Sequence, residues 1–177
     1  YAERFKVPVI NHAEDIHLRN GGVMNESALS TQLGLPGNPD ISESVMVHRD
    51  LEIAEFTNGR IHIPHVSTAR SVDLIRQYKK KGLNVTAEVT PHHLGLSENK
   101  LAQYNTNAKV YPPLRTEKNR KAIINAIKSK VISCIASDHS PVNNSIIAML
   151  NALIDANGSN YNLVQETWLA NGIHLNR

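Results

Sequence analysis

Two kinds of apolar pattern alternate along the chain. Short runs rich in β-branched residues occupy positions 7–12, 60–66, 84–90 and 130–138. Longer stretches with apolar residues at helical spacing occupy positions 41–57, 67–81 and 116–130. Alternation of strand and helix is typical of βα units, whose parallel strands share one sheet. The pattern therefore predicts an α/β protein with a parallel sheet.

The number of strands indicates half of a closed barrel. A (β/α)8 barrel contains eight strands and about 250 residues, whereas this chain has 177 residues. We therefore expect residues 1–142 to form half of a TIM-type barrel and residues 143–177 to add a short helical tail. Segment 19–40 is rich in glycine, proline and polar residues, which predicts a loop above the sheet. The start at Tyr1, in place of Met, is expected of an excerpt from a longer chain.

Composition excludes several classes of protein. Hydrophobic residues make up 41% and charged residues 20%, which is typical of a globular protein. Nineteen Lys and Arg oppose 16 Asp and Glu, and their dispersed positions do not indicate nucleic-acid binding. No apolar run reaches the roughly 18 residues of a membrane span, and the opening YAERFK lacks the apolar region expected of a secretory signal. We expect a cytoplasmic protein without a membrane partner, with Cys134 buried as a small apolar residue.

Potential metal ligands stand at the ends of three predicted strands. His12 ends the first, His65 the second and Asp138 the fourth. Carboxyl ends of parallel strands meet at one edge, and imidazole with carboxylate suits catalytic Zn²⁺. Each residue alone is more often an ordinary polar strand end, but the coincidence on three strands favours a metal site. Mn²⁺ or Co²⁺ would suit the same ligands.

Other histidines near the strand ends have supporting roles in this interpretation. His62 and His65 are three residues apart, so alternation along a strand places only one of them in the site. His92 and His93 follow the third strand, where one can line the pocket and the other can support a ligand by hydrogen bonding, and we expect structural support to be the role of both. Glu14 either orients His12 or caps the next helix.

Six segments together resemble the class I dihydroorotases of the amidohydrolase superfamily. They are NHAED, GGVMNESALSTQLGLPG, HIPHVSTARSVDLI, VTAEVTPHHLGLS, KVYPPLRTEKNR and ASDHSP. The resemblance runs from Val7 to Pro141 and implies the C-terminal half of the catalytic barrel. It further implies one or two zinc ions per site, bound by His12, His65 and Asp138, with Asp138 as general base and then acid. The implied reaction interconverts dihydroorotate and N-carbamoyl-L-aspartate in pyrimidine biosynthesis.

Two positions depart from the family pattern. Tyr111 stands where the family usually has Asn before the paired prolines, and Val142 stands where it usually has a second His. Both are substrate-binding positions in the family. The family's HxH motif and bridging lysine or aspartate would lie upstream of Tyr1, so we expect little or no dihydroorotase activity from these 177 residues alone.

Two alternatives remain open on the sequence. One is a non-catalytic structural partner of aspartate transcarbamoylase, which the substitutions Tyr111 and Val142 favour and the retained ligands disfavour. The other is a hydantoinase-like or allantoinase-like hydrolase with altered substrate contacts. The expected partners are a small-molecule substrate and either a second copy of the chain or aspartate transcarbamoylase.

Overall fold

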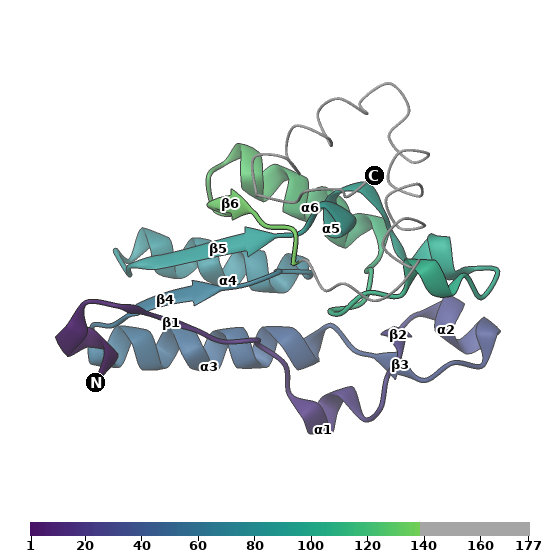
Figure 1. Ribbon diagram of the computed structural model, residues 1–177, viewed down its shortest axis with the longest axis horizontal. Coiled ribbons are helices and arrows are strands. Elements are labelled where there is room, and N and C mark those ends of the chain that lie inside the picture. Colours follow the sequence, from purple (N-terminus) through teal and green to yellow (C-terminus); the bar gives the residue numbers. More distant parts are fainter. Residues whose placement is uncertain (139–177) are drawn as a thin grey trace, which may run out of the picture.

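A parallel sheet forms the centre of the computed structural model, which describes residues 1–138 (Figure 1). Its strands are β1 (Pro8–Ile10), β4 (Arg60–Ile63), β5 (Val85–Val89) and β6 (Cys134–Ile135). They lie in the order β1-β4-β5-β6, and every neighbouring pair is parallel. Spatial order therefore follows chain order, as expected for successive βα units. The prediction of a parallel α/β sheet is confirmed.

Three long helices connect the strands. They are α3 (Ile41–Thr57), α4 (Ala69–Lys80) and α6 (Glu117–Lys128). Thr68 caps α4 by accepting the N–H of Ser71, and Thr116 caps α6 by accepting the N–H of Asn119. Such caps satisfy N–H groups that have no partner within the helix. All three helices agree closely with the predicted stretches.

Alternate residues of the central strands define two faces of the sheet. Ile61, Ile63, Val85, Ala87 and Val89 are buried in one core with apolar residues of α3, α4 and α6. The intervening residues His62, Thr86, Glu88 and Cys134 occupy the other face. His62 hydrogen-bonds Thr86 and Glu88 there, which leaves His65 as the histidine that enters the site. Helices thus cover one face of the sheet (Figure 1).

Segment 19–40 folds into short elements beside the sheet. Within it lie β2 (Met24–Asn25), α2 (Ala28–Leu33) and β3 (Gly37–Asn38), and the two strands pair in parallel. A Cβ built on Gly22 would collide with the backbone of Gly37, so glycine is needed for this close approach. Met24 packs in a second core with Leu96, Leu101, Ala108 and Leu114. The segment is therefore packed, although it contains no long helix.

The remaining elements are single turns. They are η1 (Ala2–Phe5), α1 (Ile16–Arg19), α5 (Pro91–Gly95), η2 (Glu98–Leu101) and η3 (Thr106–Ala108). No helix in residues 1–138 has both the length and the apolar character needed to cross a bilayer. The predicted tail 143–177 lies outside the described residues.

Three expectations about packing were wrong. The strands are shorter than predicted, so His12 and His65 lie in the turns that follow β1 and β4. Cys134 is exposed because it lies on the face of the sheet without helices.

The helical spacing of Val45, Leu51, Ile53, Ala54 and Phe56 predicts that they form one apolar stripe on α3, but the buried part of this stripe is narrower. Leu51 and Ala54 are buried, but Val45, Ile53 and Phe56 are exposed, because α3 contacts the sheet and α4 on one side only among the described residues.

Candidate active site

His12 and His65 come together beyond the carboxyl ends of β1 and β4. Each lies two residues after the end of its strand, and the two strands are parallel neighbours. The distance between His12 Nδ1 and His65 Nε2 is 3.0 Å, and the rings meet edge to face with centroids 4.6 Å apart. His65 has a φ of 37°, in the left-handed region that few residue types other than glycine tolerate. The two turns therefore bring the imidazole rings of His12 and His65 into contact.

The environment of His65 favours its neutral form. Burial lowers the pKa of His65 below its usual 6.5, and the nearby His12 lowers it further. The negative charge of Asp138 raises the same pKa and partly opposes these effects. A neutral imidazole has a lone pair available for a metal ion. His65 is therefore a chemically suitable metal ligand at neutral pH.

Glu14 and Tyr111 enclose His12. The Nε2 atom of His12 lies 3.9 Å from Glu14 Oε2, and its ring stacks on Tyr111 with centroids 5.5 Å apart and an angle of 4° between planes. The Tyr111 hydroxyl donates a hydrogen bond to Glu14 and accepts one from Arg19. Burial raises the pKa of Tyr111, so its hydroxyl remains protonated at neutral pH. Tyr111, predicted as a substrate-binding position, therefore contacts a predicted metal ligand.

Buried Arg115 organises the polar groups below this site. It is 3% exposed, and its Nη1 donates to Asn25 Oδ1 at 3.1 Å and to the Asn38 carbonyl at 2.6 Å. Asn38 in turn donates to Glu14 Oε1 at 2.9 Å. A buried guanidinium is stabilised only when its N–H groups find acceptors of this kind. Arg115 thereby fixes the loop on which Glu14 depends.

Glu43 completes this network on the side of α4. Arg115 Nε donates to the Ser67 hydroxyl at 3.1 Å, and that hydroxyl donates to Glu43. Glu43 also accepts from the backbone N–H and the hydroxyl of Thr68, at 3.1 and 3.0 Å. The buried carboxylate thus ties the start of α3 to the turn that carries His65.

His92 and His93 are buried in α5 below the loop that carries Tyr111. Burial lowers the pKa of each to about 4, so both are neutral at pH 7. His93 Nε2 donates to the Pro112 carbonyl at 3.0 Å. Because that nitrogen holds the proton, Nδ1 accepts from the Thr90 hydroxyl at 2.8 Å. His93 therefore holds the backbone beside Tyr111.

Not every predicted site residue joins the pair of imidazoles. Asp138 is exposed, and its charge acts on both His65 and His92. Across residues 1–138, no group of three or more His, Cys, Asp or Glu side chains is arranged to hold a metal ion. Val142 lies outside the described residues. The structure thus assembles His12 and His65 but does not gather Asp138 with them.

Two imidazoles at this spacing fit two corners of a zinc site. At Zn–N bonds of about 2.05 Å, two tetrahedral imidazole ligands would have nitrogens about 3.3 Å apart. The observed 3.0 Å between His12 Nδ1 and His65 Nε2 is close to this value. A catalytic zinc normally has at least three protein ligands. His12 and His65 would therefore hold such an ion with a third ligand, the role that the family resemblance gives to Asp138.

Sequence reasoning missed several residues of the network. Arg19, Asn25, Asn38 and Glu43 were not expected at the site, although Asn25 belongs to the segment GGVMNESALSTQLGLPG. They reach it through contacts between residues far apart in the sequence, such as Arg19 with Tyr111.

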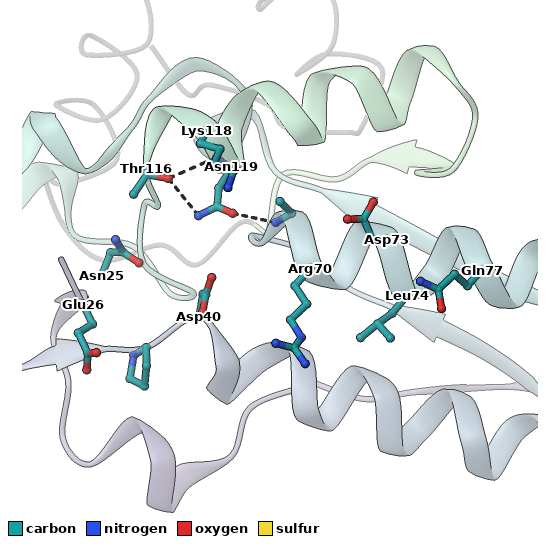
Figure 2. Close-up of a pocket in the computed structure, with 12 residues that line it drawn as sticks. Asn25, Glu26, Asp40, Arg70, Asp73, Leu74, Gln77, Thr116, Lys118 and Asn119 are labelled. Carbon is teal, nitrogen blue, oxygen red and sulfur yellow. Dashed lines mark hydrogen bonds between the residues drawn. The ribbon is translucent and has the colours of Figure 1, made fainter.

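A separate cavity of about 700 Å³ opens at the starts of α4 and α6. Figure 2 shows Arg70 and Asp73 of α4 beside Lys118 and Asn119 of α6. Asn119 Oδ1 accepts the N–H of Ala69 at 2.8 Å and so joins the two helices. None of the predicted site residues lines this cavity. It is therefore distinct from the site at His12 and His65.

Solved structures share this architecture. Dihydropyrimidinase from Brevibacillus agri NCHU1002 aligns with a TM-score of 0.68 and 24% identity, over 80% of this chain and 32% of that one. L-Hydantoinase from Arthrobacter aurescens aligns with a TM-score of 0.67 and 21% identity, over 84% of this chain and 34% of that one. Likeness at this identity concerns the fold. The chain thus has part of a TIM-barrel fold.

Comparison of sequences gives relatives that are more similar to this chain than the solved structures are. The "Dihydroorotase" of Ruminiclostridium cellulolyticum is 50% identical over 141 residues, and that of Anaplasma phagocytophilum is 46% identical over 142 residues. Both alignments cover 80% of this chain, but only 33% and 32% of the relatives. A scan against protein-family models found no match. The chain is a homologue of the dihydroorotases that spans about one third of their length, and the predicted resemblance is confirmed.

Proposed function

We propose that the chain supplies the C-terminal half of the catalytic barrel of a zinc-dependent dihydroorotase. The observation that carries this proposal is the 3.0 Å approach of two imidazole nitrogens at the carboxyl ends of neighbouring strands. Catalytic groups of TIM barrels lie at that end of the sheet. Homology to proteins named dihydroorotase supports the choice of reaction.

The reaction is the reversible hydrolysis of a cyclic amide. Water adds to the ring carbonyl of dihydroorotate, the C–N bond breaks, and the nitrogen gains a proton to give N-carbamoyl-L-aspartate. A bound zinc ion would supply Lewis-acid polarisation of that carbonyl. His12 and His65 would hold the ion, and Asp138 would take the proton from water and return it to the leaving nitrogen.

The surrounding residues keep the imidazoles in place in this proposal. Glu14 lies beside His12, and His93 supports the backbone next to Tyr111. His92 is buried with His93, which fits the supporting role expected for both. Such outer contacts orient ligands and are often as necessary as the ligands themselves.

Further polypeptide belongs to the proposed active form. On α3, Phe56 is 92% exposed, and Ile53, which is 54% exposed, lines a groove of about 470 Å³ between α3 and β1 together with the exposed residues Val9 and Ile10. Exposed apolar side chains in such a cluster favour a protein contact. We propose that this face packs against the rest of the barrel, and that the active assembly is a homo-oligomer or a complex with aspartate transcarbamoylase in the cytoplasm.

Zinc titration tests the site directly. The 177-residue chain, stripped of metal, is titrated with Zn²⁺ by calorimetry beside His65→Ala and the control His48→Ala. His48 lies on α3 and pairs with Glu52, away from the site. We expect one zinc per chain, with affinity reduced at least tenfold in His65→Ala and unchanged in His48→Ala. Equal binding by all three proteins, or no binding by the unsubstituted chain, would refute the proposed metal site.

A further inference from the structure

The ring of Tyr111 lies against the ring of His12. The two rings are nearly parallel, with an angle of 4° between their planes and centroids 5.5 Å apart. Aromatic contacts of this kind favour one relative orientation. The His12 side chain is 42% exposed, so solvent alone would leave its ring free to rotate. Tyr111 is therefore well placed to restrict that rotation.

The two ring nitrogens of His12 make its other contacts. Nδ1 faces His65 at 3.0 Å, and Nε2 faces Glu14 at 3.9 Å. Rotation of the ring would break both contacts, and Tyr111 opposes that rotation. The orientation that brings Nδ1 toward His65 is thus held by neighbours at both nitrogens and by the adjacent ring of Tyr111.

Tyr111 is itself anchored. Its hydroxyl lies between Glu14 and Arg19, and the Arg19 guanidinium carbon is 5.5 Å from the centre of its ring. Glu14 is fixed by Asn38, whose carbonyl accepts from buried Arg115. A continuous set of hydrogen bonds therefore connects the protein interior to the Tyr111 ring.

We propose that Tyr111 is a positioning residue, whose ring holds His12 in the orientation required for binding a divalent metal ion together with His65. This inference rests on the proposed function, because it concerns the same pair of imidazoles. A side chain without a ring at position 111 leaves His12 free to adopt other rotamers. Metal affinity then falls, by roughly threefold to tenfold for loss of one aromatic contact.

Three variants separate the ring from its hydroxyl. Tyr111→Phe keeps the ring, Tyr111→Leu removes it, and Tyr104→Leu removes a tyrosine whose hydroxyl contacts the Leu33 carbonyl away from the site. Zn²⁺ affinity is measured for each by calorimetry. We expect Tyr104→Leu to bind within threefold of the unsubstituted chain and Tyr111→Leu to bind three to ten times more weakly. Tyr111→Phe keeps the ring but loses its hydroxyl anchor, so we expect its affinity to lie between these two. Equal weakening in Tyr111→Phe and Tyr111→Leu would overturn the role of the ring.

A second measurement needs neither metal nor substitution. Proton NMR of the metal-free chain should show nuclear Overhauser contacts between the Tyr111 ring and the His12 ring, with the His12 carbon-bound protons shifted upfield. Absence of both would overturn the inference whatever the chain binds. Their presence without any zinc binding would support the contact between the rings and refute the proposed metal site, so the two failures are distinguishable.

Discussion

Acid should destabilise the chain through His93. Its pKa is about 4 in the folded protein, because burial disfavours the charged form, and about 6.5 when unfolded. Between these values the unfolded state binds a proton that the folded state does not, so stability falls as pH falls from 6.5 to 4. Above 6.5 both states are neutral and the effect vanishes; below about 4 it levels off.

The size of the effect follows from the two pKa values. Each unit of difference corresponds to about 1.4 kcal/mol, so His93 accounts for a loss of about 2 kcal/mol between pH 6.5 and pH 5 and about 3 kcal/mol by pH 4. A domain stable by only 5–15 kcal/mol, as is typical, would show this clearly. The neighbouring His92, with a pKa also near 4, would add a loss of the same sign.

Urea unfolding at pH 7.5, 6.5, 5.5 and 5.0 measures this dependence. His93→Gln can still donate a hydrogen bond toward the Pro112 carbonyl but does not titrate. We expect the variant to be less stable at pH 7.5 and to lose about 2 kcal/mol less than the unsubstituted chain between pH 6.5 and 5.0. His48→Gln, at an exposed position, serves as the control. Identical pH dependence of unfolding in His93→Gln and the unsubstituted chain would refute the reasoning.

Three further outcomes are expected. Arg115→Met should lower the free energy of unfolding by about 3 kcal/mol, since it leaves buried acceptors on Asn25 and Asn38 without their donor; a loss below about 1 kcal/mol in urea unfolding would contradict this. Gly22→Ala should cost about 2 kcal/mol in the same assay, because its Cβ meets the Gly37 backbone, and an unchanged midpoint would argue against that close approach. The metal-loaded chain alone should hydrolyse dihydroorotate no faster than buffer, as judged by chromatography of the product, and turnover abolished by His65→Ala would prove this wrong.

Local pattern was sufficient to predict the main elements of the fold. Strand-like runs and amphipathic stretches have different periods, so α3, α4 and α6 could be recognised along with the four parallel strands. The positions of His12 and His65 near strand ends also predicted that their side chains meet, because parallel strands bring their carboxyl ends to one edge of the sheet. These conclusions depend on residues close together in the sequence.

Contacts between distant segments could not be predicted in this way. Tyr111 lies 97 positions after Glu14, and neither position carries a local signal that the two side chains meet. The position of Arg115 directly after PPL suggests that it alone of the basic residues near α6 approaches the site, but its burial and its partners Asn25 and Asn38 are visible only in the packed structure. The exposure of Cys134 and Phe56 likewise depends on which faces of the sheet and of α3 find a neighbour.

The left-handed backbone at His65 limits which amino acids position 65 can accept, whatever the function of the side chain. With φ at 37°, glycine, asparagine, aspartate and histidine are favoured by conformation alone, and β-branched residues are penalised. A mutational scan selected only for folding would therefore enrich those four residues, whereas selection for zinc binding would retain histidine. Comparing the amino acids enriched at position 65 in the two selections would separate the requirement of the backbone turn from the requirement of metal binding.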